Sequence, residues 1–190
     1  MLVQDTRSLT PAGRRIVAAA EELFYDRGIT AVGVDLIAEH SGVTKRTLYN
    51  RFGSKDQLVA VYLAERDRRW RSHVRTAVDA CDSPAEAVLA PFEALRTWSG
   101  AGARGCAFIN ALAELPDPAH PAHRIAADQK LWLRNLFEEL ATAADRPRPA
   151  ALATRLLVLH EGALATQPLA LDTLTETTAL ARALVADDAV

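Results

Sequence analysis

The chain of 190 residues carries 22 lysine and arginine against 24 aspartate and glutamate side chains, for a formal net charge of −2, and 49% of its residues are hydrophobic. This composition fits one or two globular units with a substantial core and excludes a largely disordered chain. Two cysteines are too few for a disulfide framework. The longest apolar runs are far shorter than the roughly 20 residues that cross a bilayer. No secretory signal pattern opens the chain, so we expect a cytoplasmic location with no membrane contact.

Three short helices are predicted at the N-terminus from their start and stop signals. The first is expected over residues 11–27, with Thr10-Pro11 supplying a capping hydroxyl and a proline at the first helical position. A second helix is expected to stop at Ser41-Gly42, and a third to lie between its cap Thr44 and Gly53. This arrangement, with a glycine in the turn between the second and third helices, is typical of a helix-turn-helix.

The rest of the chain is also predicted to be helical. A fourth helix is expected to start after the capping residue Ser54 and to run without a breaker to Cys81, over about 40 Å at 1.5 Å per residue. Further helices are expected over about 84–99, 104–115, 122–144, 149–166 and 173–186. No segment alternates with the period of a strand, so we predict an all-α fold of nine helices.

Positive charge is concentrated in residues 41–55, which hold four basic side chains and no carboxylate. They sum to +4 and leave −6 for the remainder, an asymmetry typical of a DNA-binding protein. If Leu48 and Phe52 face the core, Arg46 and Asn50 lie on the opposite helix face, where their donors suit base edges. The predicted DNA-binding residues are Thr44, Lys45, Arg46, Thr47, Tyr49, Asn50, Arg51 and Lys55. Of these, Lys45, Tyr49, Arg51 and Lys55 suit phosphate oxygens. A solvated helix face is the alternative, and the helix-turn-helix spacing favours DNA.

These N-terminal residues resemble a known family. Its signature is matched by Arg27-Gly28, Val34-Asp35-Leu36-Ile37-Ala38, Ser41-Gly42-Val43, Thr47-Leu48-Tyr49, Phe52, Ser54-Lys55 and Leu58. The stretch resembles the N-terminal signature of the TetR (tetracycline-repressor-like) transcriptional regulators. The resemblance implies a homodimer with a helix-turn-helix DNA-binding domain over residues 1–56 and a ligand-binding and dimerisation domain over 57–190.

One departure from the family pattern concerns the second helix. Many relatives resemble Thr-Ser-Val-Arg where this chain has Val32-Gly33-Val34-Asp35, which leaves open whether this helix contacts phosphate. Asp35 is expected to interact favourably with the positive N-terminus of its helix.

Six side chains beyond the N-terminal unit are candidates for a ligand site. They are Trp70, Trp98, Phe108, Asn110, Trp132 and His160. Aromatic residues at helical spacing more often belong to the core than to a pocket. Asn110 and His160 are polar groups on apolar stripes, and each needs a partner that can be backbone, water or a ligand. Whether these two are pocket or core residues stays open from the sequence.

Apolar stripes on the last two helices predict a dimer interface. Leu152, Leu156, Leu159 and Ala163 share one stripe, and Leu174, Leu180 and Leu184 fall nearly on another. Two such helices from each subunit can form a four-helix bundle, and a two-fold protein suits a palindromic site on DNA. The alternative is that the stripes close the core of the monomer.

Catalytic and metal-binding patterns find no support in the sequence. His120 and His123 lie near Asp117 but lack a fourth ligand at a telling spacing. No nucleophile elbow or glycine-rich phosphate loop occurs, so we expect neither an enzyme nor a bound cofactor. The sequence predicts a ligand-responsive transcriptional regulator, most simply a repressor that a small-molecule effector releases from a palindromic operator. The alternatives are an activator without effector release and an all-α ligand-binding protein with a vestigial DNA head.

Overall fold

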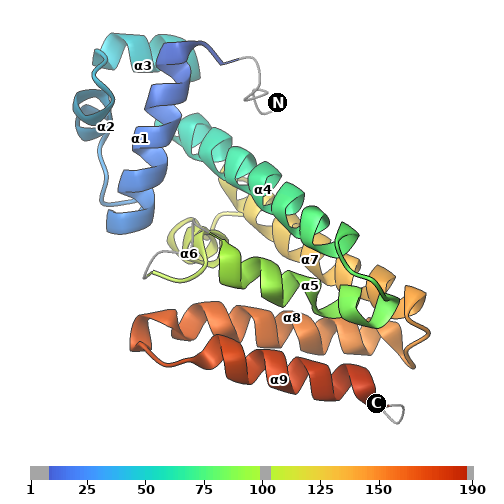
Figure 1. Cartoon of the computed structure of the whole chain (residues 1–190). Coiled ribbons are helices and arrows are strands. Elements are labelled where there is room, and N and C mark those ends of the chain that lie inside the picture. Colours follow the sequence, from blue (N-terminus) through green and yellow to red (C-terminus); the bar gives the residue numbers. More distant parts are fainter. Residues whose placement is uncertain (1–8, 99–103, 188–190) are drawn as a thin grey trace. The chain divides into compact units, whose positions relative to one another are not determined.

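The computed structural model describes residues 9–98 and 104–187, and within these ranges the chain is helical and contains no strand (Figure 1). The α-helices are α1 (Pro11–Arg27), α2 (Val34–Ser41), α3 (Lys45–Phe52), α4 (Lys55–Asp79), α5 (Pro84–Thr97), α6 (Ala107–Glu114), α7 (Pro121–Ala143), α8 (Pro149–Thr166) and α9 (Thr173–Ala186). The prediction of an all-α fold with nine helices is confirmed over the described part of the chain. Helix α6 is shorter at both ends than the expected 104–115.

The helix starts follow the capping signals of the sequence. The hydroxyl of Thr10 accepts a hydrogen bond from the amide of Gly13, and Thr44 caps α3 in the same way. Ser83 caps α5 by accepting from the amide of Glu86 at 3.3 Å. These hydroxyls satisfy amides that have no partner inside their own helix.

The described residues form two compact units. The first contains residues 9–68 and 107–128, and the second contains 69–98, 104–106 and 129–187. This division differs from the predicted boundary after residue 56, because the first unit extends to residue 68 and also contains α6 and the start of α7. The functional assignment of residues 1–56 and 57–190 stays a prediction.

The core of the first unit lies between α1, α2, α3 and the beginning of α4. Leu48 and Phe52 are both buried there, as predicted from their spacing on the third helix. Ile16 and Leu23 of α1 and Ile37 of α2 are buried with them. Since Leu48 and Phe52 point inward, the residues on the opposite face of α3 point into solvent.

The core of the second unit is built by α5, α7, α8 and α9. It contains Phe92, Phe137, Leu152 and Leu156, and Leu159, Leu174 and Leu184 pack against it while partly buried.

The predicted dimer interface is therefore wrong for Leu152, Leu156 and Ala163, whose side chains are buried inside their own subunit. The apolar stripe of α8 faces the core of the monomer, which was the alternative to a dimer interface in the sequence analysis. Leu180 is 55% exposed, and Val158 of α8, which the prediction did not include, is 66% exposed. These two are the large apolar side chains that α8 and α9 present to solvent among the described residues.

No helix in the described ranges is long and apolar enough to span a membrane.

Candidate DNA-binding and effector sites

The turn between α2 and α3 fixes the direction of α3. Gly42 adopts φ 64° and ψ 35°, a left-handed conformation that glycine reaches without strain. Its amide donates to the carbonyl of Glu39, and the amide of Val43 donates to that of Ala38. Ser41 is buried and its hydroxyl donates to the carbonyl of Ile37 at 2.7 Å. This hydrogen-bonded turn holds the two helices as a rigid pair.

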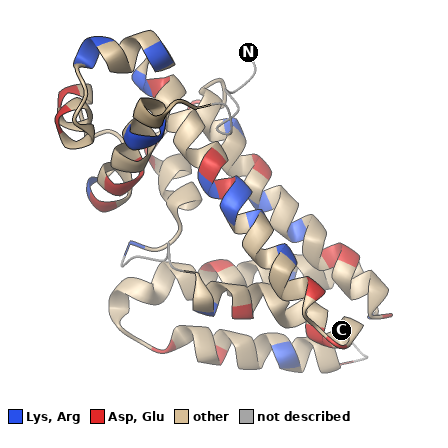
Figure 2. Cartoon of the chain, turned by 45° about the horizontal axis from the view of Figure 1, so that its top comes forward, with Lys and Arg blue, Asp and Glu red and all other residues tan. Residues whose placement is uncertain are grey.

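All eight predicted DNA-binding residues lie on α3 or directly beside it. Thr44, Lys45, Arg46, Thr47, Tyr49 and Asn50 are exposed, and Arg51 and Lys55 are partly buried. Basic residues occur toward both ends of α3 (Figure 2). The outward face combines hydroxyl, amide and guanidinium groups, which are the side-chain types that bind bases and phosphates. Their placement is as predicted, and their contact with DNA remains a prediction.

Lys45 is engaged in an ion pair that the sequence did not reveal. Its Nζ atom lies 2.9 Å from Oδ1 and 3.1 Å from Oδ2 of Asp35, in the first turn of α2. The hydrogen bond and the charge of Asp35 raise the pKa of Lys45. Asp35 thus does more than face the positive end of its own helix. The pair joins residues from two helices across a turn, so helical spacing could not indicate it.

Lys55 opens α4 close to the aromatic core of the first unit. Its Nζ atom lies 5.9 Å from the ring centroid of Phe24, within cation–π range. Burial lowers the pKa of Lys55. The hydroxyl of Ser54 caps this helix start by accepting from the amide of Gln57 at 3.1 Å.

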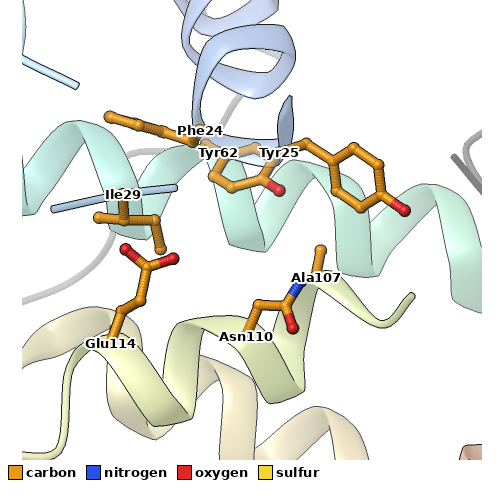
Figure 3. A pocket seen from close by; sticks show the side chains of 7 residues that line it. All are labelled: Phe24, Tyr25, Ile29, Tyr62, Ala107, Asn110 and Glu114. Atoms are coloured by element: carbon orange, nitrogen blue, oxygen red, sulfur yellow. The ribbon is translucent and has the colours of Figure 1, made fainter. Parts of the chain in front are cut away.

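A small cavity lies among α1, α4 and α6 within the first unit (Figure 3). Its lining residues are Phe24, Tyr25, Ile29, Tyr62, Ala107, Asn110 and Glu114. The volume is about 10 Å³, which is room for one water molecule. Asn110, predicted as a ligand residue, therefore borders a site too small for an organic effector, and Phe108 of the same helix is buried.

The end of α6 is tied to the loop that leads into α2. Oε2 of Glu114 accepts hydrogen bonds from the amide of Thr30 at 2.8 Å and from its hydroxyl at 3.0 Å. Gly28, with φ 95°, leaves room for this carboxylate, since a Cβ atom there would lie 3.2 Å from it. The contact joins residues 84 positions apart, and no local signal in the sequence indicated it.

Three of the predicted ligand residues gather in the second unit. The ring centroids of Trp70 and Trp98 lie 5.3 Å apart, and those of Trp70 and His160 lie 5.8 Å apart. Phe92 completes this group of rings at 5.6 Å from His160. Trp132, the remaining candidate of this unit, instead stacks under the guanidinium of Arg71 at 4.8 Å.

A buried ionic cluster adjoins these rings. Nζ of Lys130 donates to Oε1 of Glu161 at 2.8 Å, and Nδ1 of His160 lies 3.3 Å from the same oxygen. Burial raises the pKa of Glu161, but His160 and Lys130 outweigh it and lower the pKa to about 2. Burial lowers the pKa of His160. Burial also lowers the pKa of Lys130, but Cys106 and Glu161 outweigh that effect and raise it overall.

Three buried side-chain oxygens of the second unit have no hydrogen-bond partner in the structure. They are Oε2 of Glu161, Oε1 of Gln167 and Oε1 of Gln129, whose side chain is 1% exposed. A buried polar atom without a partner is unfavourable unless water or a ligand satisfies it. Because these buried oxygens can accept hydrogen bonds from a ligand, the second unit is a better candidate for an effector site than the small cavity beside Asn110.

His120, in the loop before α7, and His123, in the first turn of α7, have partners within the first unit. Nε2 of His120 lies 3.4 Å from Oδ1 of Asp56, and Nδ1 of His123 lies 2.8 Å from the carbonyl of Leu115. Both histidine side chains are half-buried. Across 9–98 and 104–187, no three histidine, cysteine or acidic side chains gather as metal ligands would.

Comparison with known proteins agrees with this geometry. Residues 16–62 match the family model for bacterial regulatory proteins of the tetR family. The structure is also similar to that of SCO4454, a TetR-family transcriptional regulator from Streptomyces coelicolor, with a TM-score of 0.80 and 34% sequence identity over 92% of both chains. The chain belongs to the TetR family of transcriptional regulators. The family resemblance of the N-terminal residues is thereby confirmed, and the matched stretch contains the whole α2–α3 pair.

Relatives of this TetR-family regulator include both a repressor and an activator. The transcriptional repressor KstR2 of Mycolicibacterium smegmatis is 29% identical over 152 residues, which cover 77% of this chain and 74% of the relative. The transcriptional activator FasR of the same species is 36% identical over 80 residues, 42% of this chain and 36% of the relative. Of these two matches, the one with the repressor covers more of this chain.

Proposed function

We propose that this TetR-family regulator is a cytoplasmic repressor that binds a palindromic operator as a homodimer and is released by a small-molecule effector. The observation that carries the proposal is the exposed polar and basic face of α3, held by the rigid turn at Gly42, on a chain whose net charge is −2. On a protein of negative net charge, a local positive surface attracts the DNA phosphates to that surface, here the exposed face of α3. The proposal includes no catalysis and no resident cofactor.

Base reading is assigned to the centre of α3 and phosphate binding to its flanks. Arg46 and Asn50 lie one helical turn apart on the exposed face, so both can point into one major groove. Guanidinium and amide groups make two hydrogen bonds to guanine and adenine, respectively. Thr44, Thr47, Tyr49, Arg51 and Lys55 surround this pair and can hold phosphate oxygens.

Replacing Arg46 or Asn50 by alanine should cost about 1–3 kcal/mol of binding free energy on the operator and relax base preference at one position of each half-site. Fluorescence anisotropy with the operator and with single-base variants measures both effects. Lys55→Ala is the control, because a lost phosphate contact weakens operator and random duplexes alike. It should make the salt dependence of binding shallower by about 0.9 per subunit. If the two alanine variants keep the affinity and the base preference of the original protein, α3 does not read bases.

Effector binding is assigned to the second unit, around Trp70, Trp98, His160 and the Lys130–Glu161 pair. Aromatic rings supply apolar contact, and the unpartnered oxygens of Glu161 and Gln129 can accept hydrogen bonds from a ligand. Similarity to KstR2, a repressor, over three quarters of the chain supports repression. Similarity to the activator FasR over 42% of the chain makes transcriptional activation the second candidate function.

The test combines transcription with binding. An operator selected from random duplexes is placed over a promoter, where the protein should lower transcription in vitro. Compounds that raise the melting temperature of the protein should lower its operator affinity, and operator DNA should lower their affinity by the same factor, because coupling between two sites is reciprocal. Higher transcription on binding would identify an activator. Stabilising compounds that leave operator affinity unchanged would contradict release by an effector.

A further inference from the structure

The ion pair between α2 and α3 bears directly on how the protein distinguishes its operator from other DNA. We propose that Asp35 is a specificity-determining residue: it holds the ammonium group of Lys45 and thereby limits attraction to phosphate backbones of any sequence. This inference rests on the proposed DNA-binding function. It concerns a residue at which the chain departs from the family pattern, in a helix whose phosphate contact the sequence left open.

Asp35 forms a close ion pair with Lys45, and the side chain of Lys45 remains exposed to approaching DNA. Both carboxylate oxygens lie within 3.1 Å of Nζ of Lys45. The side chain of Lys45 is 50% exposed and that of Asp35 is 78% exposed. A phosphate group approaching the start of α3 would therefore compete with Asp35 for the same ammonium, and would meet a carboxylate of its own sign.

Asp35 also weakens a second source of attraction. It lies in the first turn of α2, whose N-cap is Gly33, a residue without a capping side chain. The unpaired amides at the start of a helix attract anions such as phosphate. A carboxylate in that turn offsets their partial positive charge. Asp35 thus weakens the electrostatic attraction of DNA phosphates both to the ammonium of Lys45 and to the N-terminus of α2.

Asp35 should lower affinity for random DNA more than affinity for the operator. Affinity for random duplexes comes almost entirely from phosphate contacts, and the loose geometry of such complexes lets a flexible lysine find a phosphate. On the operator, base contacts by Arg46 and Asn50 fix the position of the protein, so Lys45 gains only if a phosphate lies within reach. By lowering affinity for random DNA by a larger factor than affinity for the operator, Asp35 raises the ratio of operator to random affinity.

The experiment measures salt-dependent binding of four variants to operator and random duplexes. Asp35→Asn removes the charge, keeps the shape and frees Lys45. Glu39→Gln is the matched control, because Glu39 is exposed on the same helix and its replacement changes the net charge equally. Lys45→Gln alone and combined with Asp35→Asn shows whether the effect passes through the lysine.

Asp35→Asn should raise affinity for random DNA by up to about eight-fold per subunit at about 0.1 M salt and steepen the salt dependence by about 0.9 per subunit. Glu39→Gln should change the slope little. The slope change should be absent when Lys45 is glutamine, and the ratio of operator to random affinity should fall in Asp35→Asn. Helicity and melting temperature show that each variant is folded.

Equal effects of Asp35→Asn and Glu39→Gln would overturn the inference, because net charge alone would then explain them. So would an unchanged operator-to-random ratio in Asp35→Asn. If the unaltered protein binds no duplex in a salt-dependent way, the proposed function fails and this inference fails with it. Salt-dependent binding of the unaltered protein together with an inert Asp35→Asn refutes the inference alone.

Discussion

Glutamate in place of Leu156 should leave the second unit unfolded, whereas glutamate in place of Val158, two residues further along α8, should leave it folded. Leu156 is 0% exposed and packs in one cluster with Phe92 and Phe137, while Val158 is 66% exposed. A carboxylate at 156 would be buried without a partner, at a cost of several kcal/mol in a protein whose whole stability is typically about 5–15 kcal/mol. Circular dichroism during heating separates the two outcomes.

Val158→Glu, together with Leu180→Glu, also tests the proposed dimer. If a second subunit covers the exposed apolar side chains of α8 and α9, then Val158→Glu and Leu180→Glu should give folded monomers in sedimentation experiments. Operator binding should weaken with them, because each half-site would be bound separately. A folded Leu156→Glu protein would refute the core position of this stripe. Dimers that persist in both Val158→Glu and Leu180→Glu would place the interface elsewhere.

Replacing Lys130 by methionine should lower the free energy of unfolding by about 3–5 kcal/mol, the usual effect of breaking a buried ion pair from one side. The variant leaves Glu161 buried without its cation, while the other carboxylate oxygen already has no hydrogen-bond partner. The double variant Lys130→Met, Glu161→Leu removes both charges and should recover much of the loss. Urea unfolding of the three proteins measures the difference. If Lys130→Met alone is as stable as the original protein, the pair is not buried as the structure has it.

Acid should destabilise the original protein through the same cluster. The pKa of Glu161 falls from an ordinary 4.5 to about 2 in the folded chain, so its contribution is complete above pH 4.5 and is lost as the pH falls toward 2. The pKa of His160 is lowered by burial, so the unfolded chain binds this proton first, and stability begins to fall near pH 6.5. The double variant should lose less stability between pH 4.5 and 2 than the original protein does.

The N-terminal helices could be predicted from sequence because their signals are local. Thr10 and Thr44 bond to amides three residues away, and Gly42 marks a turn that few other residues adopt without strain. The outward face of α3 followed from the inward positions of Leu48 and Phe52. Each of these inferences needs only the geometry of one helix or one turn.

Contacts between distant segments could not be predicted in this way. The stripe through Leu156 showed that α8 has an apolar face, but periodicity does not say whether the partner is the same subunit or a second one. The bond from Glu114 to Thr30 and the ion pair from Lys45 to Asp35 join polar residues on separate elements. His160 and Trp98 drew notice through polarity and size, yet their approach to Trp70 depends on the packing of three helices.

The bond between Glu114 and Thr30 has a practical consequence for anyone who would build hybrid regulators by exchanging heads. A fragment cut after residue 56 would lose α6, and with it the acceptor that holds the amide and hydroxyl of Thr30. It would also lose most of α4, including Tyr62, whose ring lies 5.9 Å from that of Phe24. A transplantable DNA-binding unit would have to carry residues 107–128 along with the N-terminal segment, which means three crossovers in the gene and not one.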